Sequence, residues 1–395
     1  MIRGRGIAAA VIMLAVPVLL AACQRPSTRA VSTPGPTVAD VRTLRRGLTD
    51  SEADAYLGDK ACAPCHPDIA EEHARSHHAR TLLKVAPAVH VPYFQRKRKI
   101  EDPFAGVVYS PLVIDGRPGM QLVSATEKAA LPADYVIGAG ANAHTYFCVV
   151  QPGYWMDLRL SYYPKSGKWD FTPGQRPGQG VPTSAGKPQV GRRLTACLLC
   201  HVTALREKNG VPDVERSLLG VGCERCHGSG REHVRAAERG DADAARGAME
   251  SLGKAAPDRL TRMCGFCHQD STVAIPGKPH TEKDLPRFQS AALERSKCYV
   301  KSGTLSCITC HGPHGNADGS PRNDEAACAT CHSTGGTTCK AGHATGCAKC
   351  HMPRQAIEGI PSARYTNHWI KVWRTVEEGS GKAGATGPVG EGDER

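Results

Sequence analysis

The sequence repeats one pentapeptide, Cys-x-x-Cys-His, seven times. With 18 cysteines and 17 histidines in 395 residues, chance would give roughly 0.04 copies of this motif. Two cysteines at this spacing form thioether bonds with the two vinyl groups of one haem, and the histidine that follows reaches its iron. The copies are Cys62-Cys65-His66, Cys197-Cys200-His201, Cys223-Cys226-His227, Cys264-Cys267-His268, Cys307-Cys310-His311, Cys328-Cys331-His332 and Cys347-Cys350-His351.

Two other chemistries use paired cysteines at this spacing. A structural zinc site takes Cys-x-x-Cys pairs, but it needs no histidine directly after each pair. A thioredoxin-like redox motif occurs once, inside a βαβ unit. The sequence therefore predicts seven covalently bound haem c groups, each with a proximal histidine from its own motif.

The N-terminus indicates export. A short basic region with Arg3 and Arg5 precedes an apolar run over residues 7–22, which predicts a signal peptide over residues 1–22. The run ends in Leu20-Ala21-Ala22-Cys23, which resembles the lipobox of bacterial lipoproteins. This resemblance implies lipidation of Cys23 and an anchor on the periplasmic side of the inner or outer membrane. The alternative is an ordinary cleavage site beside a chance cysteine.

Composition bears on the fold class. Aromatic residues make up only 5% of the chain, whereas Gly and Pro number 42 and 28, so a conventional core is hard to fill. Seven haems would provide apolar volume, and their covalent links would hold the chain as disulfides hold small domains. We expect a multihaem cytochrome c fold that is mainly α with little regular secondary structure. It would have a haem-packed core and a small antiparallel β insert.

The motifs and the turn residues divide the chain into segments. Asp115-Gly116 predicts a hairpin within residues 106–124, and Gln151-Pro152-Gly153 predicts a second hairpin between residues 144–150 and 154–163. The expected segments are a signal peptide (1–22), a lipidated flexible tether (23–55), a first haem segment (56–86), a haem-free β-rich insert (87–191), a six-haem domain (192–373) and a disordered tail (374–395).

The net charge is misleading if the haems are ignored. The formal value of +12 is typical of proteins that bind nucleic acid or anionic membranes. A bis-histidine haem with two ionised propionates, however, carries about −1 when ferric and about −2 when ferrous. Seven haems would offset most of the excess, so we exclude nucleic acid as a partner.

Ten histidines remain after the seven proximal ligands are subtracted from 17, which exceeds the number needed for a second axial ligand on every iron. A doubly ligated iron has no vacant position for a substrate, so it carries electrons. The predicted distal ligands are His78, His144, His233, His280, His314, His343 and His368, which leaves His73, His77 and His90. The sequence does not pair a distal histidine with a particular haem.

Several segments are similar to the cytochrome c554-like multihaem family. Cys62 to His78, with Ser76-His77-His78-Ala79, resembles the first haem segment of that family, and this resemblance implies that His78 is an axial ligand. The fifth motif continues as C-H-G-P-H, and in this C-x-x-C-H-x-P-H pattern the last histidine, here His314, usually binds a neighbouring haem. The final motif reads C-A-K-C-H-M-P, which is also similar to that family.

The six motifs after residue 192 follow one another too closely for each haem to occupy its own domain. Neighbouring haems must lie close together, which predicts electron hopping between them and redox proteins as donor and acceptor. The alternative is a multihaem nitrite- or hydroxylamine-type enzyme with one open iron, although no Cys-x-x-Cys-Lys variant occurs. A structural subunit of a conductive filament is a third class.

Three cysteines stand outside the motifs in addition to Cys23. In an oxidising compartment Cys298 and Cys339 form the simplest disulfide pair. Cys148 lies in a predicted strand, where we expect a small buried apolar side chain.

Overall fold

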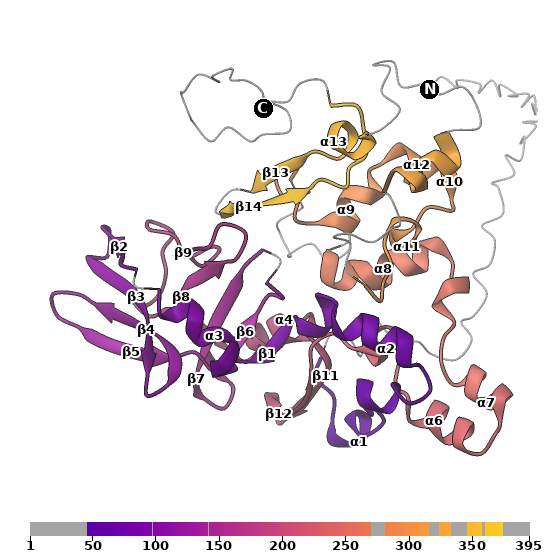
Figure 1. The fold of residues 1–395 in the computed structure, drawn as a ribbon, viewed down its shortest axis with the longest axis horizontal. Coiled ribbons are helices and arrows are strands. Elements are labelled where there is room, and N and C mark those ends of the chain that lie inside the picture. The colour runs from indigo at the N-terminus through magenta and orange to yellow at the C-terminus, as the bar shows by residue number, and fades with distance from the viewer. Residues whose placement is uncertain are drawn as a thin grey trace, which may run out of the picture. The chain divides into compact units, whose positions relative to one another are not determined.

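The computed structural model describes residues 46–96, 98–140, 142–269, 281–315, 324–332, 346–357 and 360–373 (Figure 1). The chain divides into two units, 1–36 and 37–395, and every described residue belongs to the second. The predicted signal peptide, Cys23, His280, Cys339, His343 and the predicted tail lie outside the described residues. None of the helices in the described ranges has the length and apolar character that a membrane crossing requires.

A six-stranded antiparallel sheet has the order β1-β6-β7-β8-β10, and β9 pairs with β8. Its hairpin β7–β8 pairs Val149 with Trp155 across the predicted Gln151-Pro152-Gly153 turn, so this prediction is confirmed. The strands are β1 (Leu82–Lys84), β6 (Tyr135–Ile137), β7 (His144–Gln151), β8 (Tyr154–Tyr163), β9 (Lys168–Phe171) and β10 (Gly186–Val190).

A second sheet has four strands in the order β2-β3-β4-β5. Asp115 and Gly116 have positive φ angles of 47° and 77°, which two-residue hairpin turns of type I′ require, and Ile114 pairs with Arg117 across them. This predicted hairpin is also confirmed. The strands are β2 (Ile100–Asp102), β3 (Val107–Ile114), β4 (Arg117–Val123) and β5 (Lys128–Pro132), and helix α3 (Pro87–Phe94) contacts β3 and β4.

Two apolar clusters form a conventional core around these strands. One cluster centres on the fully buried Tyr109 and Tyr146 and includes Cys148, which is 5% exposed, as predicted for a small apolar side chain. The other joins Trp155 of the six-stranded sheet to Leu198 of helix α4 (Arg192–Leu199). The second motif therefore begins on a helix that is packed against a β-sheet.

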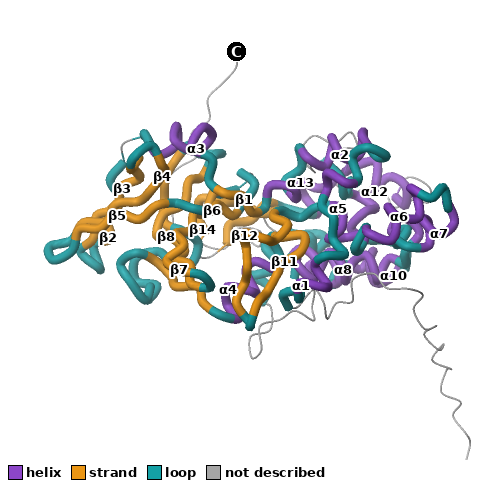
Figure 2. The backbone as a smooth tube through the Cα atoms, turned by 90° about the horizontal axis from the view of Figure 1, so that it is seen from below, coloured by secondary structure: helices purple, strands orange, loops and turns teal. Residues whose placement is uncertain are grey.

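The expectation of a mainly α fold is wrong. About 33% of the described residues are helical and 29% lie in strands, and Figure 2 shows the strands in orange across much of the described chain. Two further hairpins stand among the motifs: β11 (Val202–Lys208) with β12 (Val211–Leu219), and β13 (Arg354–Ile357) with β14 (Ile360–Thr366). Asn209-Gly210, a strong hairpin signal that was not among the predicted turns, connects β11 to β12, and both residues have positive φ.

Short helices carry most of the remaining motifs, whereas the first motif forms a turn between a 3₁₀ helix (Asp59–Ala61) and α2. The Ala-, Arg- and Glu-rich stretch that begins near residue 232 forms two helices instead of one, with a break at Gly240, whose φ is 74°. Asp241 caps the second of these helices by accepting a hydrogen bond from the Ala244 N–H. The other helices are α2 (Pro67–Ala74), α5 (Cys223–His227), α6 (Arg231–Glu238), α7 (Ala242–Gly247), α8 (Pro257–His268), α9 (Gln289–Glu294), α10 (Lys297–Ser302), α11 (Cys307–Cys310), α12 (Asp324–His332) and α13 (Cys347–His351).

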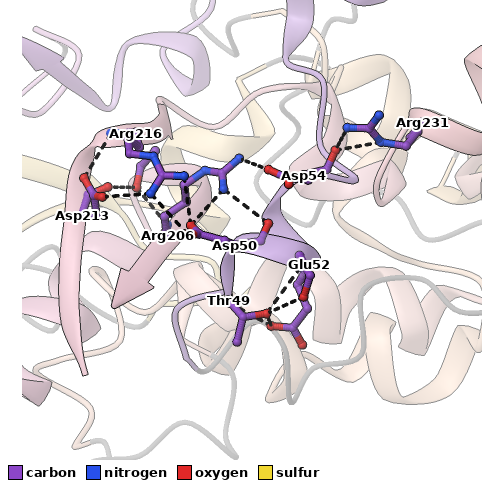
Figure 3. A network of polar contacts seen from close by, with 10 residues as sticks. Thr49, Asp50, Glu52, Asp54, Arg206, Asp213, Arg216 and Arg231 are labelled. Atoms are coloured by element: carbon purple, nitrogen blue, oxygen red, sulfur yellow. Dashed lines mark hydrogen bonds and ion pairs between the residues drawn. The ribbon is translucent and has the colours of Figure 1, made fainter. Parts of the chain in front are cut away.

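The first described residues are fixed onto the β11–β12 hairpin. Leu48 forms a parallel bridge with Arg206 of β11. The guanidinium of Arg206 lies 2.7 Å from the Asp54 Oδ1 atom and 3.2 Å from the Asp50 Oδ1 atom (Figure 3). Helix α1 (Asp50–Ala53) begins with a capping box between Thr49 and Glu52. These contacts fix the direction in which the chain enters the first haem motif.

Candidate haem sites

A helical turn presents the three reactive side chains of a motif on one side. In the first motif the His66 N–H donates to the Cys62 carbonyl oxygen over 2.9 Å, and in the fifth the His311 N–H donates to the Cys307 carbonyl oxygen over 3.0 Å. Residues three and four positions apart share one face of a helical turn. The first cysteine, the second cysteine and the histidine of a motif can therefore reach one planar group together.

Four proximal histidines each lie opposite a histidine from another part of the chain. Two imidazoles on opposite sides of one metal, each with a metal–nitrogen distance of about 2 Å, have ring centres about 6 Å apart. The pairs and their centre-to-centre distances are His66–His233 at 6.2 Å, His268–His78 at 6.2 Å, His227–His314 at 6.2 Å and His311–His368 at 6.0 Å. This spacing fits a bis-histidine iron in all four cases.

Hydrogen bonds fix the orientation of many of these imidazoles. A histidine that ligates a metal through Nε2 typically donates its Nδ1–H to an oxygen acceptor, which sets the tautomer. The Nδ1 atoms and their acceptors are His201 with the Thr81 carbonyl at 3.2 Å, His227 with the Glu250 carbonyl at 3.4 Å, His233 with the Ala245 carbonyl at 2.8 Å, His268 with the Gln289 Oε1 at 3.4 Å, His351 with the Lys371 carbonyl at 2.9 Å and His368 with the Thr366 carbonyl at 3.0 Å. Nε2 is left as the ligand atom.

Burial keeps several of these side chains neutral. It is the main cause that lowers the pKa of His78, His201 and His368 to about 4, and neighbouring histidines act in the same direction. An imidazole binds a metal in its neutral form. These residues are therefore ready to bind iron at neutral pH without releasing a proton.

His144 lies in different surroundings from those expected of a distal ligand. Its ring contacts are with His90, Tyr93, Tyr146 and Tyr162, which line the β-rich part of the chain. Its Nδ1 atom is buried and has no hydrogen-bond partner. The structure does not bring His144 to a proximal histidine through any of these ring contacts, and its ligand role stays a prediction.

The partners of three proximal histidines also stay predictions. His280 and His343 lie outside the described residues, so the second ligands for His201, His332 and His351 are not placed. Of the histidines left over, His73 is buried with its Nδ1 atom 3.7 Å from the Asp59 carboxylate. His90 places its Nδ1 atom 3.2 Å from the Tyr146 hydroxyl.

The second motif opens into a cavity of about 410 Å³, lined by Ile137, Phe147, Asp157, Gln189, Ala196, Cys197, Cys200, His201, Cys267, Gln269, Arg287 and Phe288. Pockets for cofactors and ligands have volumes of about 300–1,000 Å³. Cys197, Cys200 and His201 share this cavity with the aromatic rings of Phe147 and Phe288. These residues fit a porphyrin attached at the second motif.

One wall of this cavity is polar. Burial raises the pKa of Asp157 to about 7, although Gln175, Lys187 and Arg193 act to lower it. The Asp157 Oδ1 atom is buried without a hydrogen-bond partner. A carboxyl group that titrates near neutral pH therefore stands beside the second motif.

Cysteines of different motifs contact one another. The Cys62 thiol is hydrogen-bonded to that of Cys223, the Cys200 thiol to that of Cys267, and the Cys264 thiol to that of Cys307. Cys226 lies within electrostatic range of both Cys264 and Cys267. The structure thus brings cysteines of the first five motifs together.

Asp59, His73 and Cys223 also meet closely enough to hold a metal ion, with one ligand atom from each within 4.8 Å of the others. Cys223 belongs to the third motif, however, and a thioether sulfur no longer offers a thiolate. The Asp59 Oδ1 atom instead accepts a hydrogen bond from the Cys223 N–H over 2.8 Å. This group therefore belongs to the contact between the first and third motifs, and no pattern in the sequence indicated it.

Two comparisons with known proteins returned a similarity. The family model described as cytochrome c554 and c-prime matches residues 179–228, a stretch that contains the second and third motifs. Among solved structures, the crystal structure of the outer cell wall cytochrome OcwA is similar over 80% of each chain, with 16% sequence identity and a TM-score of 0.45. No curated protein matches the chain.

Proposed function

We propose that the chain is a seven-haem c-type cytochrome that carries electrons, and the match of residues 179–228 to the family model of cytochrome c554 and c-prime supports this. Bound haem supplies a one-electron iron couple, while the protein sets coordination, orientation and potential. In this proposal electrons hop between closely packed and mostly bis-histidine haems.

The observation that carries the proposal is the spacing of 6.0 to 6.2 Å in four histidine pairs. An iron with two imidazole ligands has no coordination position left for a substrate, so it exchanges electrons only. Two nitrogen ligands without charge also favour a low reduction potential. The spacing therefore supports a carrier rather than a catalyst at these four sites.

The cysteine contacts support a route that departs from the order of the motifs in the sequence. Cys62 of the first motif contacts Cys223 of the third, and Cys226 of the third lies near the fourth. The fourth motif in turn contacts the second through Cys267 and the fifth through Cys264. We propose that the haem of the fourth motif is a branch point between the others.

The location and partners belong to the same proposal. Export with lipidation at Cys23 would tether the protein to the inner or outer membrane on the periplasmic side. Redox proteins would act as donor and acceptor, and nucleic acid would not bind once haem propionates offset the positive charge.

A second candidate function is redox catalysis at the second motif. The cavity there places His201 with Asp157, Gln189 and Arg287. A cation and a carboxyl group that titrates near pH 7 would bind a small anion and hold a proton beside it. This candidate requires that the iron of the second motif keeps one open position.

An electron paramagnetic resonance spectrum of the purified ferric holoprotein, with haem content measured in parallel, tests both candidates. Seven haems that are all low-spin establish the carrier, because every iron then has two strong ligands. A high-spin signal that nitrite or hydroxylamine perturbs, and that shifts in Asp157→Asn, establishes catalysis at the second motif. Fewer than seven haems would refute the assignment of all seven motifs.

A further inference from the structure

Glu224 is a buried carboxylate inside the third haem motif. It is the residue after Cys223, and only 1% of its surface is exposed. Its oxygens accept hydrogen bonds from three backbone N–H groups: Leu57 at 2.9 Å, Gly58 at 2.7 Å and Gly230 at 2.6 Å. A buried carboxylate is strongly unfavourable unless such donors surround it, so this arrangement is a built feature of the fold.

The three N–H donors lie in two segments, and each segment leads to one histidine of the His66–His233 pair. Gly58 lies just before the first motif, which contributes His66, and Gly230 lies just before His233. These two imidazoles face each other with ring centres 6.2 Å apart. Glu224 therefore binds the backbone of the segments that lead to both histidines of this pair, although its own motif carries His227.

A reciprocal contact closes the arrangement. Asp59, on the first-motif side, accepts a hydrogen bond from the Cys223 N–H over 2.8 Å, while Glu224, on the third-motif side, holds Leu57 and Gly58. The Cys62 and Cys223 sulfurs are in contact between them. The segment just before the first motif and the third motif thus each supply a carboxylate that binds the backbone of the other.

The segment before His233 is rich in glycine, so it needs a contact such as the hydrogen bond to Glu224 to hold it in one conformation. His233 follows Gly228-Ser229-Gly230, and Gly228 has a φ of 83° that favours glycine. A segment of this composition loses much conformational entropy when it is ordered. The 2.6 Å bond from the Gly230 N–H to Glu224 is placed where it holds this segment and hence the direction of His233.

The charge of Glu224 acts on its surroundings as well. Its carboxylate interacts electrostatically with Cys62 of the first motif. A buried negative charge stabilises the ferric state relative to the ferrous state, because the ferric site carries one more positive charge. This effect lowers the reduction potential of a nearby haem.

We propose that Glu224 is a positioning residue that holds the His66–His233 pair for the haem of the first motif and lowers the potential of that haem. This inference rests on the proposed function, since it needs haem at the first motif. A residue of the third motif would thus position the iron ligands of the haem at the first motif.

The experiment compares the full-length holoproteins of wild type, Glu224→Gln, Glu224→Asp and His233→Ala. The matched control is Glu232→Gln, because the Glu232 side chain lies on α6, next to His233, and is 69% exposed. Haem content, paramagnetic resonance spectra and potentiometric titrations are recorded for each protein. The His233→Ala spectrum identifies the signal of the first-motif haem when its distal ligand is lost.

Glu224→Gln keeps the size of the side chain but places an amide opposite N–H donors. We expect a fraction of one haem to show the His233→Ala spectrum, recovery of the low-spin signal with added imidazole, and an upward shift of one haem potential. Glu224→Asp keeps the charge on a shorter side chain, so we expect the same ligation change with a smaller upward shift. Glu232→Gln should match wild type.

Wild-type spectra and potentials in both Glu224 variants would overturn the inference. If Glu224→Gln is not obtained as a holoprotein, Glu224→Asp alone decides by the same criteria. Failure of the proposed function looks different, because it would show as missing haem in the wild-type protein itself.

Discussion

Among the described histidines, two kinds of surroundings differ in what the Nδ1 atom contacts. His227, His233 and His368 each direct Nδ1 to a backbone carbonyl and face another imidazole. His144 leaves its buried Nδ1 without a partner, and it packs instead among tyrosines. Residue type alone could not separate these groups, because the acceptors of His227 and His233 lie 23 and 12 residues away in the chain.

His233→Ala should convert one haem from low-spin to high-spin, because it removes the imidazole that faces His66 at 6.2 Å. Paramagnetic resonance of the ferric protein measures this change. Glu232→Ala, at an exposed neighbouring position, provides the control and should leave the spectrum unaltered. An unchanged spectrum in His233→Ala would remove this residue from the ligand set.

Asp157→Asn should reduce the pH dependence of stability. Burial raises the pKa of Asp157 to about 7 from an ordinary value of 3.8, so between these values the folded state holds a proton that the unfolded state releases. Its contribution to stability is thus present at acid pH and is lost as pH rises toward and past 7, with a slope of at most ~1.4 kcal/mol per pH unit. Thermal unfolding of both holoproteins from pH 5 to pH 8 measures it, and parallel profiles would contradict it.

At the scale of elements, the sequence predicted hairpin turns better than it predicted breaks between helices. Asp115-Gly116 correctly predicted the β3–β4 hairpin, and Asn209-Gly210 carried the same signal for β11–β12. Gly240 divides a stretch whose composition favours one helix. The extent of the two sheets was underestimated, because the low aromatic content suggested a core filled by haem. The aromatic residues are few, but side chains such as Tyr109 and Tyr146 are fully buried and fill a core between the strands.

Gly220→Ala should disturb the segment that carries His78. Gly220 has a φ of +74°, and an added Cβ would lie 2.3 Å from the Ala79 carbonyl oxygen. Gly210→Ala is the matched control, since its φ is +76° and nothing lies within 4 Å of an added Cβ. Both variants incur the left-handed strain of about 1–2 kcal/mol, and the clash should cost Gly220→Ala a further ~1–3 kcal/mol.

Denaturant unfolding of the two glycine variants measures this difference. The spectrum of the haem at His268 provides a second measurement, because His78 faces His268 at 6.2 Å. Equal stability and equal spectra for Gly220→Ala and Gly210→Ala would contradict this prediction, because the Ala79 backbone would then move away from the added Cβ with no loss of folding free energy.

At the scale of the whole molecule, the sequence predicted the seven attachment sites but not their connections. Cysteine spacing and the adjacent histidine are local features, so each motif can be identified from its own five residues. Pairs such as His66–His233 and His311–His368 join distant segments, and no periodicity reports such contacts. The contact between Cys62 and Cys223 was hidden for the same reason.

Cys23→Ser should release the protein from the membrane fraction, because it removes the residue proposed to carry the lipid. Fractionation of cells that express each form measures the distribution. Haem content should stay equal in the two forms, since Cys23 lies outside every motif. Continued membrane association of the variant would argue against lipidation.

The exchange of facing histidines between motifs has a consequence for how the chain matures. The imidazole that faces His311 of the fifth motif is His368, which follows the seventh motif. If the chain is exported and loaded with haem as proposed, an emerging chain would hold attached haems before their second ligands exist. Maturation would then finish only after the C-terminal segment is exported. A chain cut before His368 would lose the second ligand of the haem at the fifth motif, which lies far from the cut in the sequence.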